Sequence, residues 1–329
     1  MSRDTGEPRS AAQRPATLHT VICAERVLSQ LGVSVDALLR GTGILPEHLD
    51  QPDTMITHAQ EIIVFANALL LSDDSGIGLA IGNAIPVTAY GCRGTAMLTS
   101  PTLEVSLRTA YAYPLLGICY FRISLEVSGD EARAVLRNYT YRPDLLVLNT
   151  DVCLAAIRRE IMGILGRELM FSRITLGFPA PPHADRYSEF FGCPVEFDAA
   201  DTAVYFPAAE LASPLPVAHP HAFELAHRQC ERKEAELARW VPGDLVGRLL
   251  ALLFENPGRK DFDQLGLSLS TLQRRLREVG TSIGELRAGV RRDLATRYRN
   301  DTQYSPKKVA SKLGFKQPES LNRLLSDKS

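Results

Sequence analysis

The stretch that most restricts the possible folds of this chain runs from Leu265 to Leu276 and reads LGLSLSTLQRRL. Its first four residues predict a turn, and the hydroxyl of Ser268 is suited to cap a following helix. Leu269, Leu272 and Leu276 then recur at the spacing of one helix face. We therefore expect a short helix that is anchored on a helical core along this leucine stripe.

The opposite face of the same helix is expected to present Ser270, Gln273, Arg274 and Arg277. Arg and Gln side chains match the donor and acceptor edges of guanine and adenine in the major groove of DNA. A helix anchored on one side with such a face on the other has the properties of a recognition helix. An amphipathic helix of a bundle that binds no DNA has the same pattern, so one helix alone leaves both interpretations open.

A similar pair of helices is expected further along the chain. Residues 309–313 predict a short helix, Gly314 and Phe315 a turn, and residues 320–325 the next helix, while residues 291–298 predict a connecting helix between the two pairs. Two recognition helices separated by about 34 Å would fit consecutive major grooves. The outward residues of the second one are expected to be Glu319, Asn322, Arg323 and Ser326.

The distribution of charge supports this interpretation. The formal net charge of the whole chain is −1, which by itself argues against a nucleic-acid partner. Residues 1–240 hold 20 Lys and Arg against 28 Asp and Glu, a balance of −8, whereas residues 241–329 hold 17 against 10, a balance of +7. Such asymmetry is typical of a phosphate-binding module joined to an acidic domain.

The segment from Gly266 to Leu325 resembles the DNA-binding region of AraC/XylS-type transcription regulators. The similarity lies in the L-G-x-S-x-x-T-L-Q-R-R-L run, the G-T-S after it, the R-R-x-L-A connecting helix and the x-V-A-x-x-L-G-F turn. It implies a tandem pair of helix-turn-helix units joined by a linker helix. By position, it also implies base contacts at Ser270, Gln273 and Arg274 in the first unit, and at Pro318, Glu319 and Arg323 in the second.

Four departures from the family pattern stand out. Residues 261–264 are more polar and shorter than the first helix of the first unit usually is. Ser270 occupies a position where Arg is common, Pro318 opens the second recognition helix, and the sequence stops at Ser329, before the usual ending. We expect the second unit to be weakened in stability or in DNA affinity.

The first 240 residues predict an α+β fold. Apolar residues recur at helical spacing over residues 28–39 and 62–70, and a hydroxyl cap at residues 100–102 predicts another helix. Residues 119–141 indicate a β-hairpin with its turn at residues 128–130. A long helix is expected at residues 145–169. Three short strands are expected at 174–178, 195–197 and 202–206, and a final helix at 221–240.

Two segments of this half, YGCRGTAMLTSPTLEVSLRTAYAY and LGFPAPPHADRYSEFFGCPVEFDAADTAVYF, resemble the arabinose-binding-like domain of the same regulators. The resemblance implies effector binding and dimerisation. We expect a flexible tail over residues 1–16, an effector-binding and dimerisation domain over 17–235, and an all-α DNA-binding domain over 236–329.

Residues of the hairpin region are candidates for the effector site: Tyr120, Arg122, Arg137 and Tyr139. Arginines inside a pocket would suit an organic acid, an amino acid or a lipid-like acid. The alternative, which the pattern favours, is that these side chains pair at the surface or between strands.

No enzymatic site is expected. Gly280–Gly284 matches the G-x-S-x-G motif of hydrolases, but an Arg-rich helix precedes it and no His follows position 227. The glycines between Gly76 and Gly82 have the wrong spacing for a dinucleotide loop and indicate a close helix approach instead. The spacing of His219, His221 and His227 and the scattered cysteines predict no metal site, and no cofactor is expected.

The sequence therefore predicts a DNA-binding transcriptional regulator in the cytoplasm, with no signal peptide and no membrane segment. Its expected partners are double-stranded promoter DNA, a small organic effector and a second copy of the chain. Activation through RNA polymerase is implied by the resemblance alone. The alternative is a small-molecule-binding module whose basic helical tail contacts proteins and binds no specific DNA.

Overall fold

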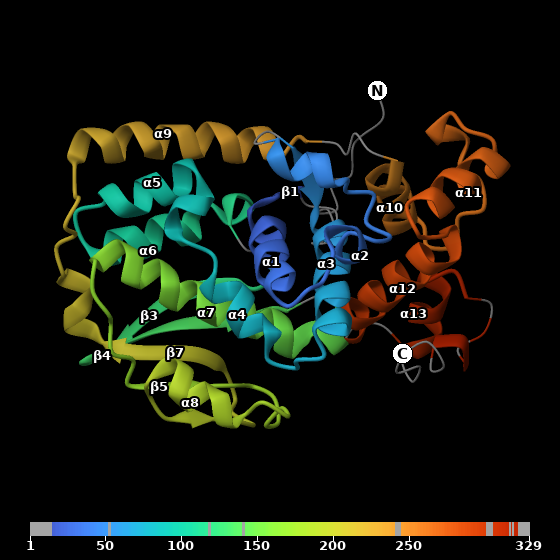
Figure 1. Cartoon of the computed structure of the whole chain (residues 1–329). Coiled ribbons are helices and arrows are strands. Elements are labelled where there is room, and N and C mark those ends of the chain that lie inside the picture. Colours follow the sequence, from blue (N-terminus) through green and yellow to red (C-terminus); the bar gives the residue numbers. More distant parts are fainter. Residues whose placement is uncertain are drawn as a thin grey trace.

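The computed structural model describes residues 15–51, 54–117, 120–139, 142–240, 245–300, 305–315, 317 and 319–321. Figure 1 shows an N-terminal part of helices and sheets, and a group of C-terminal helices gathered at one side of it. Residues 1–14 of the expected tail lie outside the described residues, and Pro15 and Ala16 belong to the first strand.

The chain begins with a small sheet and a layer of helices. Strands β1 (Pro15–Thr17) and β2 (Met55–Thr57) pair antiparallel and lead into α1 (His19–Gln30) and α3 (His58–Ser72). Thr57 caps α3, because its side chain accepts a hydrogen bond from the backbone amide of Gln60. The other helices of this part are α2 (Val35–Leu38), α4 (Ile77–Asn83), α5 (Cys92–Thr99), α6 (Leu103–Ala112) and α7 (Leu146–Leu165).

A second sheet has five strands in the order β3-β4-β7-β5-β6. The expected hairpin is present: β3 (Arg122–Ser128) and β4 (Glu131–Arg137) pair antiparallel around Gly129. The remaining strands are β5 (Arg173–Thr175), β6 (Val195–Glu196) and β7 (Thr202–Pro207), with α8 (Asp185–Phe191) between β5 and β6. Only the β5–β6 pair is parallel among the described strands of this sheet.

Two glycines of α4 allow it to lie directly against α7. A Cβ added at Gly78 would approach the carbonyl oxygen of Leu148 to 2.7 Å, and one at Gly82 would approach that of Val152 to 2.3 Å. A larger side chain at either position would force the two helices apart. The glycine run of the sequence is thus explained by close helix packing.

The C-terminal part of the chain is helical. Helix α9 (Pro220–Leu237) lies along α5 and is followed by α10 (Leu245–Glu255), the short 3-10 helix η7 (Asp263–Leu265), α11 (Leu269–Glu278), α12 (Ile283–Asn300) and α13 (Pro306–Lys312) (Figure 1). The expected order of an α+β part followed by helices is confirmed. In the part of the chain that the structure describes, no helix could span a membrane.

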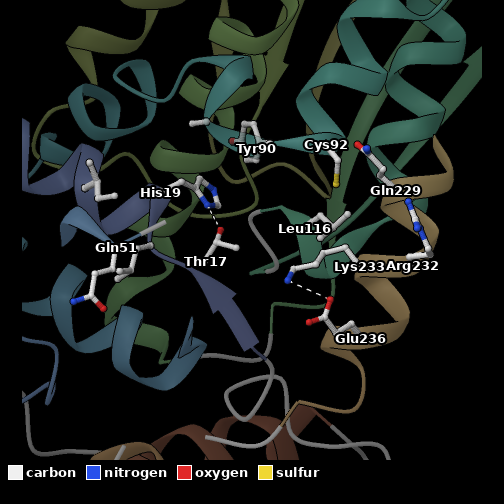
Figure 2. Close-up of a pocket in the computed structure, with 14 residues that line it drawn as sticks. Thr17, His19, Gln51, Tyr90, Cys92, Leu116, Gln229, Arg232, Lys233 and Glu236 are labelled. Carbon is white, nitrogen blue, oxygen red and sulfur yellow. Dashed lines mark hydrogen bonds and ion pairs between the residues drawn. The ribbon is translucent and has the colours of Figure 1, made fainter. Parts of the chain in front are cut away.

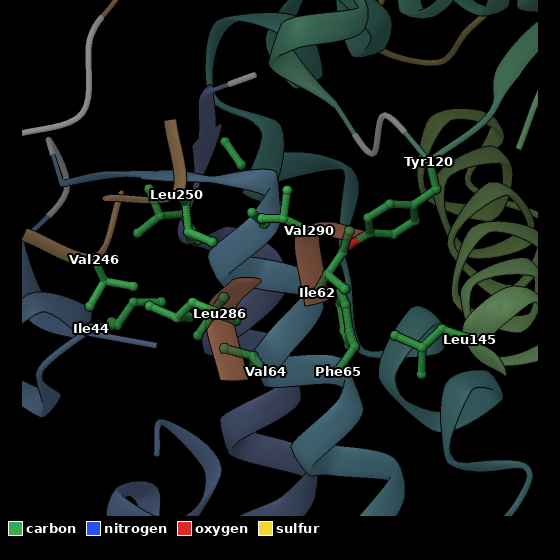
Figure 3. Packing of buried hydrophobic residues seen from close by; sticks show 14 of the residues in the cluster. Ile44, Ile62, Val64, Phe65, Tyr120, Leu145, Val246, Leu250, Leu286 and Val290 are labelled. Carbon is green, nitrogen blue, oxygen red and sulfur yellow. The ribbon is translucent and has the colours of Figure 1, made fainter. Parts of the chain in front are cut away.

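One hydrophobic core joins the two parts of the molecule. Ile62 and Phe65 of α3 belong to the same buried cluster as Leu250 of α10 and Leu286 and Val290 of α12 (Figure 3). A separate cluster fills the space between α7 and the five-stranded sheet. The C-terminal helices therefore pack on the N-terminal helical layer and not on that sheet.

Candidate nucleic-acid interface

Helix α11 is fixed at both ends and along its inner face. Ser268 caps it in an extended conformation, and its Oγ accepts a hydrogen bond from the amide of Thr271 at 3.3 Å. Leu272 and Leu276 are fully buried. Gly280, with a positive φ of 75°, turns the chain after the helix. The predicted capped helix is confirmed.

The predicted leucine stripe is shorter than expected. Leu269 is 54% exposed, so its assignment to the buried face was wrong. It is the first helical residue, and the side chains that enter the core before the helix are Phe262 and Leu265, next to and within η7. Two leucines of α11, rather than three, hold it on the core.

The outer face of α11 carries the four side chains that the sequence suggested for base contacts. Ser270, Gln273, Arg274 and Arg277 are all exposed. The guanidinium of Arg274 pairs with Glu278 at 2.6 Å, one turn later on the same helix. Such an exposed pair is worth little in water, and a DNA base edge could replace its carboxylate.

The second group of candidates is described only in part. Glu319 is exposed, and Leu321 beside it is buried. Pro318, Asn322 and Arg323 lie outside the described residues.

Helix α12 connects the two candidate units through its arginines. Arg287 donates a hydrogen bond from Nη2 to the carbonyl oxygen of Arg259, in the loop after α10, at 2.8 Å. One turn later, Arg291 donates from Nε to the carbonyl oxygen of Leu313, at the end of α13, at 2.8 Å. The guanidinium of Arg291 also lies 4.3 Å from the ring centroid of Phe315. The connecting helix thus directly contacts the loop that precedes the first candidate unit and the end of α13 in the second.

Sequence reasoning did not single out the basic residues of α13. Ser305 caps this helix, and Lys307, Lys308 and Lys312 are exposed on it. Basic residues near a helix N-terminus suit contacts to DNA phosphates, which carry affinity without sequence preference. The Ser-Pro-Lys-Lys run was the signal that could have identified them.

The end of α11 contacts the N-terminal part. The backbone amide of Gly41 donates a hydrogen bond to the carbonyl oxygen of Val279 at 2.7 Å. Gly280 lies against the side chain of Arg40, so close that a Cβ there would come within 2.6 Å of the Arg40 Cγ. The N-terminal part thus directly contacts the residues that follow the candidate recognition helix.

The four residues suggested for the effector site are dispersed around the hairpin. Tyr120 is buried, with its ring at 5.8 Å from that of Phe65 and nearly perpendicular to it. Arg122 is exposed on β3. Arg137 pairs with Glu126 of the neighbouring strand at 2.6 Å. Tyr139 donates a hydrogen bond to the carbonyl oxygen of Arg142 at 2.8 Å.

The ion pair between Arg137 and Glu126 joins two neighbouring strands, as in the alternative of pairing between strands. The ion pair lowers the pKa of Glu126, chiefly through the hydrogen bond from Arg137. In the described residues, none of the four lines either of the two cavities below.

The larger cavity, of about 670 Å³, lies between the start of α1, the start of α5 and helix α9 (Figure 2). His19 lines it, bonded to Thr17, and burial lowers the pKa of His19 to about 4. Cys92 also lines it, and a hydrogen bond with Cys230 lowers the pKa of Cys92 to about 6. On the α9 side, the ammonium group of Lys233 pairs with the carboxylate of Glu236 at 3.3 Å.

The smaller cavity, of about 400 Å³, lies between the N-terminal part and the C-terminal helices. Its walls come from α3 on one side and from α10 and α12 on the other. Both cavities have sizes typical of small-molecule sites.

Comparison with known proteins places this arrangement in a family. Residues 32–215 match the family model described as the arabinose-binding N-terminal domain of AraC transcription regulators. The ornithine utilization regulator of Pseudomonas aeruginosa is 30% identical over 94% of this chain and 93% of its own. An uncharacterised HTH-type transcriptional regulator of Mycobacterium tuberculosis is 28% identical over 94% of this chain and 91% of its own.

The crystal structure of the transcriptional regulator CdpR from Pseudomonas aeruginosa has a similar fold, with a TM-score of 0.50 at 21% identity over 93% of each chain. The relatives of this chain are transcriptional regulators and not enzymes. The family match covers more than half of the chain, and the relatives span nearly all of it. The chain belongs to the AraC family of transcription regulators.

Proposed function

We propose that this protein recognises a specific DNA sequence through the outer face of α11. The observation that carries the proposal is the exposure of Ser270, Gln273, Arg274 and Arg277 on one face of a helix that two fully buried leucines, Leu272 and Leu276, hold on the core. In this proposal η7 and α11 form the first helix-turn-helix unit. Helix α13 begins the second, which continues through Glu319 and, outside the described residues, Pro318, Asn322 and Arg323.

The proposed division of the chain follows the same lines. Residues 17–235 form the effector-binding and dimerisation domain, and residues 236–329 the DNA-binding domain, with the division near the end of α9. The hydrogen bonds of Arg287 and Arg291 support a fixed spacing of the two units. A homodimer would present four such units, which sharpens specificity for a symmetric or repeated site.

In the proposed regulation, a small organic effector changes the arrangement of the two domains and thereby promoter binding. The effector must bind one arrangement more tightly than the other, because equal affinity shifts no equilibrium. The hydrogen bond from Gly41 to Val279 supports this proposal, since it connects the N-terminal part to the end of α11. Activation through RNA polymerase is the expected output.

A mobility-shift titration of the full chain on its own upstream DNA tests the proposal. We expect tighter binding to that fragment than to a shuffled duplex of equal composition, with a slope of log K against log salt of about −0.9 per phosphate contacted. Equal affinity for both duplexes, or an affinity that does not depend on salt, would favour a module whose basic helices contact proteins.

A further inference from the structure

The cavity between the two parts of the molecule combines an apolar floor with a cationic rim. Its floor includes Ile62 and Ile63 of α3, Leu250 and Phe254 of α10, and Leu286 of α12. Except for Ile63, which is partly exposed, these side chains are buried in the shared core. A floor of this kind binds the apolar body of a small molecule and excludes water from it.

Three arginines lie around this floor, from three separate segments: Arg40, Arg142 and Arg292. Arg142 forms an ion pair with Asp144, in which its Nε lies 3.1 Å from the Asp144 Oδ1. Arg40 makes no ion pair within the described part of the chain. Glu285 is the carboxylate that lines the cavity, and it is exposed. Cationic groups thus exceed anionic ones in the walls.

The backbone next to Arg40 is held in place at the rim. The side-chain amide of Asn67 donates hydrogen bonds to the carbonyl oxygens of Leu38 and Arg40, both at 2.8 Å. Asn67 itself lines the cavity. The backbone from which the Arg40 side chain extends is therefore held at the rim of the cavity.

We propose that this cavity is the binding site for a small organic anion, a carboxylate with an aromatic or aliphatic body, and that Arg40 binds its carboxylate. Arg forms two parallel hydrogen bonds with a carboxylate, which favours it over a neutral group of the same shape. The regulatory meaning of the site rests on the function proposed above. Since both parts of the molecule form its walls, an occupant alters how they pack, and with it the contact between Gly41 and Val279.

Gly289 provides a means to close the cavity without disturbing the fold. It lines the cavity from α12, and a Cβ at this position would meet nothing within 4 Å. Gly289→Leu therefore places a side chain into the open space, and Leu favours the helical conformation over Gly. Gly284→Leu is the matched control, because Gly284 lies on the same helix, is exposed and does not line the cavity.

The experiment measures the fluorescence of anilinonaphthalene sulfonate, an aromatic anion, bound to the full chain. We expect Gly289→Leu to raise its Kd by a factor on the order of ten or more, while Gly284→Leu leaves it unchanged. Arg40→Met should raise the Kd by at least about tenfold, because it removes the charge-assisted hydrogen bonds of the guanidinium. Arg26→Met, at an exposed position of α1 away from the cavity, should not. Naphthoate should displace the probe, and neutral naphthamide should not.

The site assignment is wrong if the probe fails to bind, or if it binds Gly289→Leu as tightly as the unaltered chain. Equal displacement by naphthoate and naphthamide would contradict the role of Arg40. DNA affinity is measured on the same samples without the probe. A chain that binds the probe but no specific DNA would retain the site and lose the proposed function, so the two failures are distinguishable.

Discussion

The amide of Gly41 donates a hydrogen bond to the carbonyl oxygen of Val279 at 2.7 Å, and this bond connects the N-terminal part to the last turn of α11. Val279 follows Glu278, whose carboxylate pairs with Arg274. The loop before Gly41 also carries Arg40, which lines the cavity between the two parts. One short segment thus touches both the candidate effector site and the end of the candidate recognition helix.

Arg274→Ala is expected to weaken specific DNA binding by about 1–3 kcal/mol and to relax the preference at one base pair. Arg108→Ala is the control, because Arg108 and Glu104 form a similar exposed pair one helical turn apart on α6, at 2.8 Å. Mobility-shift titrations on a set of single-base variants of the site give both quantities. A uniform loss on every variant would mean that Arg274 contacts only phosphates.

Leu276→Ala is expected to reduce the free energy of unfolding by about 2–5 kcal/mol, because the side chain is fully buried and leaves a cavity. Leu269→Ala, on the same helix but largely exposed, should change it by no more than about 0.5 kcal/mol. Urea denaturation of the full chain measures both. Equal losses would show that Leu269 is buried after all.

Gly314→Ala should destabilise the second unit for two reasons. Its φ of 70° costs a residue with a side chain about 1–2 kcal/mol. In addition, the new Cβ would lie 2.5 Å from the Cα of Gly258. Gly129→Ala is the matched control, since its φ is also positive, at 58°, but nothing lies within 4 Å. Urea denaturation gives the loss in free energy of unfolding for both variants, and the excess at Gly314 measures the cost of its close approach to Gly258. Equal losses in the two variants would contradict such a cost.

Stability should fall as the pH falls from 7 to 5.5, because of His19. Burial lowers its folded pKa to about 4, below the ordinary value of 6.5, so the unfolded chain binds the additional proton in this range. Through His19 the free energy of unfolding should drop by about 1 kcal/mol between these two pH values, and Cys92, whose pKa is lowered to about 6 in the folded chain, should add to the loss. Glu61 contributes little here, because its pKa is lowered and it titrates in more acidic solution.

The His19→Gln variant should show a smaller loss over the same interval. His19 faces Tyr90, with ring centroids at 4.7 Å, and lies near His58, Glu61 and Arg93, all of which the variant retains. Urea denaturation at both pH values gives the comparison. An unchanged dependence on pH would assign the effect to another group.

The sequence was informative where local chemistry decides the structure. The cap at Ser268, the hairpin turn at Gly129 and the close packing at Gly78 all depend on a few adjacent residues, and all are present. Leu269 was misassigned because helical spacing alone does not reveal where the first turn of a helix leaves the core.

The relations between distant segments could not be predicted. Neither the bond between Gly41 and Val279 nor the cavity beside it leaves a local pattern, because each depends on how α3 packs against α10 and α12. Tyr120 and Arg137 were chosen by residue type and by their place in a hairpin. In the structure Arg137 instead pairs with Glu126 across the sheet, and Tyr120 is buried in the hydrophobic core.

A footprint of the full chain on its own upstream DNA at physiological salt tests the central claim most directly. We expect protection over consecutive major grooves on one face of the DNA, and Arg274→Ala should remove the protection of the groove that α11 contacts. Protection that is absent, or that does not depend on the DNA sequence, would contradict specific recognition by this helix.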